Sequence, residues 1–177
     1  MKSKLALLAV TAMAAITATS AHAQAAEESP FTPEQKLLML SVAELHNKPE
    51  TVRQMFEYCA KQVDDFAIEN AAVLSGWRER NQPFLLLKAG LQKQVDVIAQ
   101  KEGMTPADVE DLMVTNAKDI ASAFPERMES ENALARAFVC NLYAGKVRDG
   151  EFDVGYDKPD VRQALENYRS AAASKGR

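Results

Sequence analysis

The chain has 177 residues, of which 47% are hydrophobic and 26% are charged, with 21 Lys and Arg against 25 Asp and Glu. This composition excludes wholesale disorder and a collagen-like fibre, and the length is sufficient for one self-contained hydrophobic core. A formal net charge of −4 argues against nucleic-acid binding, which depends on clustered Lys and Arg side chains that neutralise phosphates.

Residues 1–23 have the organisation of a secretory signal peptide. A basic start with Lys2 and Lys4 is followed by an apolar run over residues 5–16, and the small residues Ala21 and Ala23 form an A-x-A cleavage site. The apolar run is too short to span a membrane as a helix, which takes ~20 residues. We therefore expect a cleaved signal peptide, export to a bacterial periplasm and no stable membrane insertion after cleavage.

The next division of the chain falls near residue 32. Residues 24–31 are predicted to be a flexible entry segment, and residues 32–177 a single helical domain. The helical domain begins with Thr32-Pro33-Glu34-Gln35, which combines a Thr N-cap, Pro at the first helical position and Gln at the third. The first helix is predicted to end near Leu45, with His46 capping its last carbonyl groups.

The chain has two cysteines, Cys59 and Cys140, which lie 81 positions apart. In an oxidising compartment an isolated pair of cysteines most simply forms a disulfide. Thiol oxidoreductases usually carry a C-x-x-C motif at the start of a helix, and neither cysteine has such a neighbour. The sequence therefore predicts a structural disulfide between Cys59 and Cys140.

The most regular helical pattern follows Pro49, which is predicted to open a second helix. Its apolar positions are spaced alternately by four and three residues, which is typical of one buried helix face. These positions are Val52, Phe56, Cys59, Val63, Phe66, Asn70, Val73 and Trp77. Asn70 is the polar exception: it could fix the register of a homodimer, or bond to Asn116 or Asn141 inside a monomeric bundle.

Prolines and a glycine divide the rest of the chain into further helices. Pro83 is predicted to separate the second helix from a third, which Gly103 ends. A fourth helix starts at Thr105 and ends at Pro125, and a sixth follows Pro159.

The fifth predicted helix begins near Ser130 and differs from the others in its pattern. It is apolar over most of its circumference, which favours a place in the middle of a bundle. No alternation of polar and apolar residues of useful length indicates a strand. The fold class is therefore all-α: a compact bundle of four to six helices, stapled by one disulfide.

No catalytic arrangement accompanies the single histidine of the mature chain, His46. Nucleophilic catalysis would need a Ser or Cys motif beside it, and a zinc site would need several His or Cys ligands at metal spacing. No phosphate-binding glycine-rich motif is present either. We expect a protein that is not an enzyme and that has no cofactor.

An acidic segment runs from Asp149 to Asp160. Read as a twelve-residue calcium loop, it has oxygen-bearing side chains at positions 1, 3, 5, 9 and 12. Val154 stands where such loops need Gly, however, and Asp160 stands where they have a bidentate Glu. A solvated acidic connection between two helices is the alternative interpretation.

The sequence Phe31-Thr32-Pro33-Glu34-Gln35 resembles the L-T-x-x-Q motif of the small helical envelope-stress proteins, the Spy/CpxP group of periplasmic chaperone-like proteins. Phe takes the place of Leu in this five-residue match. The resemblance implies a cradle-shaped helical dimer that holds unfolded clients.

These observations predict a periplasmic helical protein that acts non-catalytically by binding another protein of the cell envelope. Trp and Arg are enriched at interface hot spots, so Trp77, Arg78 and Arg80 are the candidate partner-binding residues. The alternative is a chaperone-like or Ca²⁺-responsive envelope-stress protein. Whether the chain is a monomer or a homodimer stays open.

Overall fold

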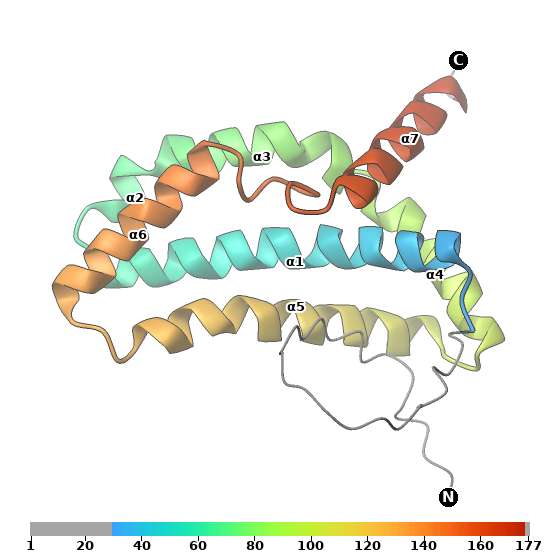
Figure 1. Ribbon diagram of the computed structural model, residues 1–177, viewed down its shortest axis with the longest axis horizontal. Coiled ribbons are helices and arrows are strands. Elements are labelled where there is room, and N and C mark those ends of the chain that lie inside the picture. The colour runs from blue at the N-terminus through green and yellow to red at the C-terminus, as the bar shows by residue number, and fades with distance from the viewer. Residues whose placement is uncertain (1–29, 176–177) are drawn as a thin grey trace, which may run out of the picture. The chain divides into compact units, whose positions relative to one another are not determined.

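A computed structural model describes residues 30–175, and the predicted signal peptide and residues 24–29 of the predicted entry segment lie outside this range (Figure 1). The described part has seven helices and no strand, which confirms the all-α class. The helices are α1 (Pro33–Gln62), α2 (Phe66–Glu69), α3 (Ala71–Leu85), α4 (Lys88–Lys101), α5 (Pro106–Met128), α6 (Ala133–Arg148) and α7 (Pro159–Lys175).

Helix α1 is the element around which the others pack. It contacts α4, α5, α6 and α7, and α5 lies along it in the same direction (Figure 1). The N-terminal half of α1 contributes Leu38, Val42 and Leu45 to a first hydrophobic cluster, together with residues of α4, α5 and α7. Its C-terminal half contributes Val52 and Cys59, among others, to a second cluster shared with α3 and α6.

The first helix is longer than the sequence predicted. It starts as expected, with a capping box in which the Gln35 amide N–H donates to Thr32 Oγ1 over 3.2 Å and the Thr32 amide to Gln35 Oε1 over 2.8 Å. The predicted end at Leu45 is wrong, because α1 continues through Pro49. Proline removes one backbone hydrogen bond, and burial of apolar side chains on both sides of Pro49 offsets that loss.

The regular pattern over residues 52–77 is not one helix. Helix α1 ends at Gln62, and Asp65 adopts a left-handed conformation with φ of 57° before the chain turns back through α2 into α3. The alternating spacing continues across this break because the end of α1 and the start of α3 face the same second cluster. The regular spacing over residues 52–77 therefore reflects burial in one shared cluster and not one continuous helix.

Two further prolines do not stop their helices, which continue for two or three residues beyond them. Pro83 lies in the last turn of α3, and Pro125 in the last turn of α5. Two other predicted boundaries are confirmed: Gly103 follows α4 with φ of 79°, and Thr105 forms a capping box with Asp108 at the start of α5. The helix predicted to begin near Ser130 begins at Ala133.

The predicted disulfide is confirmed. Cys59 of α1 and Cys140 of α6 are bonded, with their Cα atoms 5.6 Å apart, and both residues are fully buried. The bond holds α6 against the second cluster.

The polar seam residue Asn70 is buried, but neither predicted partner contacts it. Its Nδ2 donates to the Phe66 carbonyl oxygen over 3.0 Å, while Asn116 and Asn141 are exposed. The Asn70 side chain therefore forms its hydrogen bond locally, at the turn between α2 and α3.

Across the described helices, none combines the length and apolarity that a membrane span requires.

Candidate functional site

Helix α6 carries an exposed row of large apolar side chains. Leu134 is 82% exposed, Phe138 68% and Leu142 47%, and their spacing of four residues places all three on one face of the helix. We call these three residues the α6 stripe. The prediction that this helix lies in the middle of the bundle is wrong, since Cys140, Ala144 and Val147 are its only fully buried residues.

The other side of α6 is firmly attached. The Cys140 disulfide fixes its middle to α1, and Arg136 Nη1 donates to Gln62 Oε1 at the end of α1 over 2.7 Å. Asn132 caps the start of α6 itself, where its Oδ1 accepts from the Ala135 amide over 3.0 Å. The α6 stripe is thus presented on a rigid helix. The sequence signal for it was the nearly all-round apolar pattern, which hydropathy alone cannot distinguish from burial.

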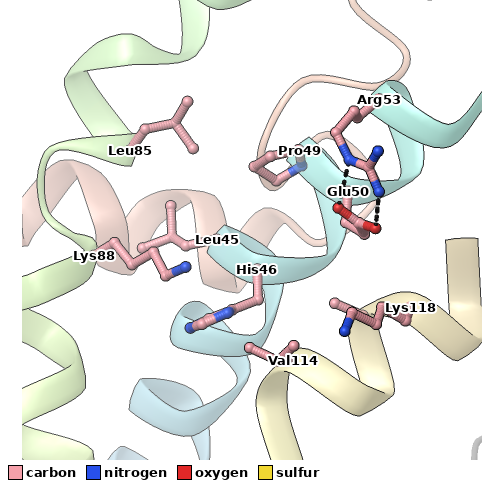
Figure 2. A pocket seen from close by; sticks show the side chains of 10 residues that line it. Leu45, His46, Pro49, Glu50, Arg53, Leu85, Lys88, Val114 and Lys118 are labelled. Carbon is pink, nitrogen blue, oxygen red and sulfur yellow. Dashed lines mark hydrogen bonds and ion pairs between the residues drawn. The ribbon is translucent and has the colours of Figure 1, made fainter. Parts of the chain in front are cut away.

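His46 does not cap a helix end, contrary to prediction. It lies in the middle of α1 and is buried (Figure 2). Its Nε2 is 3.4 Å from Gln92 Oε1 and 3.9 Å from a Glu110 carboxylate oxygen. Burial lowers the pKa of His46, and the positive charge of Lys88 lowers it further against the opposing effect of Glu110. The imidazole is therefore held neutral at neutral pH.

The structure gives two of the three candidate partner-binding residues contacts within the chain. Trp77 is 3% exposed, and its Nε1 donates to the Phe152 carbonyl oxygen over 3.0 Å. Arg80 forms an ion pair with Asp153 and donates to the Val147 carbonyl oxygen. Only Arg78 is exposed without a contact of this kind, so a partner role for this end of α3 stays a prediction that rests on Arg78.

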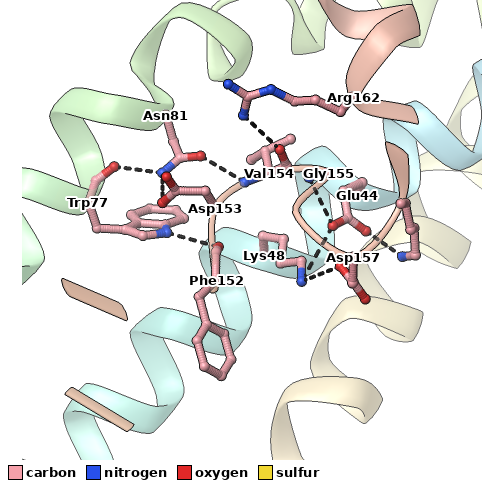
Figure 3. Close-up of polar contacts among 11 residues, drawn as sticks. Glu44, Lys48, Trp77, Asn81, Phe152, Asp153, Val154, Gly155, Asp157 and Arg162 are labelled. Atoms are coloured by element: carbon pink, nitrogen blue, oxygen red, sulfur yellow. Dashed lines mark hydrogen bonds and ion pairs between the residues drawn. The ribbon is translucent and has the colours of Figure 1, made fainter. Parts of the chain in front are cut away.

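Trp77, Asn81 and Arg80 together fix the loop of residues 149–158, which connects α6 to α7. Figure 3 shows the contacts of Trp77 and Asn81 with this loop. The Asn81 side chain is fully buried: its Oδ1 accepts from the Val154 amide over 2.8 Å, and its Nδ2 donates to Asp153 Oδ1 over 2.9 Å. These bonds place the Val154 side chain in the first hydrophobic cluster.

A buried carboxylate holds the second half of the same loop. Glu44 of α1 is 1% exposed, accepts from the Gly155 amide over 3.3 Å, and forms ion pairs with Lys48 and Lys158 (Figure 3). Lys48 also pairs with Asp157 over 2.9 Å. Burial acts to raise the pKa of Asp157, but the hydrogen bond and charge of Lys48 outweigh it, and the net shift is downward.

The acidic segment from Asp149 to Asp160 thus directs several of its side chains to protein partners. Asp153 binds Arg80 and Asn81, Asp157 binds Lys48, and Glu151 binds Lys146. Val154, at the position where calcium loops need Gly, is fully buried. Over the described residues, no group of three or more His, Cys, Asp or Glu side chains is placed to hold a metal ion.

No protein-family model matches the chain, and neither a curated protein nor a solved structure is significantly similar to it. The resemblance to the Spy/CpxP group therefore rests on the five residues 31–35. In the structure, Thr32 and Gln35 of this motif form the capping box of α1.

Proposed function

We propose that this protein is exported to the periplasm and acts without catalysis, by binding another protein of the cell envelope through the α6 stripe. The observation that carries the proposal is the exposure of Leu134, Phe138 and Leu142 on one face of a helix that is fixed from behind. Contiguous exposed apolar side chains of this size typically mark an interaction surface. The buried disulfide supports export, because such bonds persist in oxidising compartments.

The spacing of the stripe favours a helical partner. Residues at i, i+4 and i+8 form a narrow apolar ridge, which fits the groove between apolar residues on an amphipathic helix. Charges flank the ridge unequally, with Glu129 and Glu131 before its start and Arg148 beyond its end, where Lys146 is paired with Glu151. A partner helix that runs antiparallel to α6, with acidic residues near its N-terminus and basic residues near its C-terminus, would face opposite charges at both ends.

Cross-linking in intact cells tests the proposal directly. A photoreactive amino acid at position 141, beside the stripe, should capture one discrete partner, identified after affinity purification. The double variant Leu134→Ser/Phe138→Ser should abolish this cross-link. The matched control is Ile68→Ser/Leu86→Ser, which removes two equally exposed apolar side chains elsewhere (78% and 75% exposed) and should leave the cross-link unchanged.

A chaperone-like function is the second candidate, because an exposed apolar helix face can also hold unfolded clients. It predicts a broad set of cross-linked envelope proteins and suppression of client aggregation in vitro. A discrete partner with no effect on aggregation would contradict it. Equal cross-linking by the stripe variant and its control would contradict both functions.

A further inference from the structure

A pocket of about 300 Å³ lies beside the middle of α1, where α1 faces the junction of α3 with α4 and the centre of α5 (Figure 2). Its apolar wall consists of Leu45, Pro49, Leu85, Val114 and Ala117. Pro49 has no N–H and cannot bond to the Leu45 carbonyl, so the helix wall here lacks one internal hydrogen bond. This pocket is separate from the α6 stripe.

The charged side chains around the pocket are mostly cationic, in a chain whose net charge is negative. Arg53, Lys88 and Lys118 line it, against one lining carboxylate, Glu50. Glu50 is already bound by Arg53, with N–O distances of 2.5 and 2.9 Å, and the resulting hydrogen bonds lower its pKa. Arg53 also binds Glu57. The charge of Lys118 contributes to the lowered pKa of Glu50, so Glu50 is a single lining carboxylate shared between Arg53 and Lys118.

Lys88 and Lys118 are the two other cations that line the pocket. They come from different helices, α4 and α5, and neither forms an ion pair with any residue between 30 and 175. Two unpaired ammonium groups beside an apolar wall create a positive potential, which attracts an anion that can also cover apolar surface. The buried His46 also lines the pocket and adds a polar group to it.

We propose that this pocket binds a small organic carboxylate with an apolar body, its carboxylate paired with Lys88 or Lys118 and its body against Leu45, Leu85 and Val114. A pocket of about 300 Å³ is at the lower end of the range for small-molecule sites and selects a compact ligand. The apolar wall distinguishes this class from inorganic phosphate or sulfate, which would leave that wall uncovered.

Calorimetry on the purified, disulfide-bonded protein tests the ligand class with three matched probes. Octanoate should bind with 1:1 saturation, and at least tenfold more tightly than 1-octanol, which has the same chain without the charge. Octylamine, with the opposite charge, should not bind. Absence of saturable octanoate binding, or equal binding of octanoate and 1-octanol, would overturn the proposal.

Variants locate the site. Lys88→Gln/Lys118→Gln should weaken octanoate binding at least tenfold. The control, Lys93→Gln/Lys101→Gln, removes two exposed lysines of α4 outside the pocket and should leave octanoate binding unchanged. Val114→Phe should block the pocket and abolish binding while both lysines remain. In the wild type, octanoate should raise the pKa of His46, measured by NMR, because it neutralises the charge of Lys88. Octanoate binding that survives both the lysine and the Val114 variants would place the ligand elsewhere and refute the site.

Discussion

The two hydrophobic clusters along α1 are closed by different chemistry. The second cluster contains the Cys59–Cys140 disulfide, which joins α1 to α6 covalently. The first cluster has no covalent link; its outer edge is the 149–158 loop, held by the buried Glu44 and Asn81. In both clusters a residue of α1 binds a segment more than 80 positions away in the sequence: Cys59 is bonded to α6, and Glu44 to the 149–158 loop.

Because of this difference, we expect the stability of the two clusters to respond to different substitutions. A disulfide acts largely by limiting the unfolded chain, so its effect is independent of pH and salt around the cluster. A buried carboxylate stabilises only while its cationic and N–H partners are present and correctly placed. The first cluster should therefore respond to single polar substitutions, and the second to loss of the covalent bond.

Loss of the disulfide should have the largest effect. The double variant Cys59→Ala/Cys140→Ala should lower the free energy of unfolding by about 4 kcal/mol, because it releases a long loop in the unfolded chain. Urea denaturation monitored by circular dichroism measures this loss. A thiol assay on denatured, non-reduced wild type should find no free thiol, and a loss below about 1 kcal/mol would contradict the predicted role of the bond.

Removal of the buried carboxylate should come next. Glu44→Ala leaves the Gly155 amide without its acceptor and Lys48 with a single partner, so we expect a loss of about 3 kcal/mol. The control is Asp157→Ala, which removes an exposed partner of Lys48 and should cost less than about 1 kcal/mol. Equal losses of unfolding free energy in the two variants would contradict the larger stabilising effect expected of the buried Glu44 carboxylate.

The loop backbone offers a finer comparison. Gly155 has φ of +74°, and an added Cβ would lie 2.9 Å from Arg162 Cβ, whereas Gly103 has φ of +79° with open space around it. Gly103→Ala should cost about 1 kcal/mol from conformation alone, and Gly155→Ala about 2 kcal/mol or more because a steric clash is added. Thermal unfolding of both variants under one condition measures the difference, and identical melting temperatures would contradict the close packing of the loop.

His46 should make the first cluster sensitive to mild acid. Its pKa is lowered in the folded state, mainly by burial, so between the unfolded value of about 6.5 and the lower folded value the unfolded chain binds more protons. Stability is therefore present above this window and lost as the pH falls through it, by at most about 1.4 kcal/mol at pH 5.5. Urea denaturation at pH 7.5 and 5.5 should show this loss in the wild type, and a smaller one in His46→Gln.

Sequence reasoning recovered what short-range chemistry decides. The capping boxes at Thr32 and Thr105 and the end of α4 near Gly103 follow from local hydrogen bonding and backbone freedom. The disulfide followed from the number of cysteines and the expected compartment.

Errors arose where tertiary packing overrides local preference. Pro49, Pro83 and Pro125 lie inside helices because burial on either side offsets one missing hydrogen bond. The pattern over residues 52–77 was mostly buried, as predicted, but it is divided among α1, α2 and α3. The fixation of the loop by Glu44 and Asn81 joins residues more than 70 positions apart, and no local pattern could indicate it.

The α6 stripe should give the smallest change in stability of all. Phe138→Ser removes a side chain that is mostly exposed, so the free energy of unfolding should change by less than about 0.5 kcal/mol, whereas Val147→Ala, on the buried side of the same helix, should cost about 2 kcal/mol. Denaturation of both variants measures this contrast. A large loss in Phe138→Ser would mean that the stripe is covered within the folded protein, and that it serves the second cluster rather than a partner.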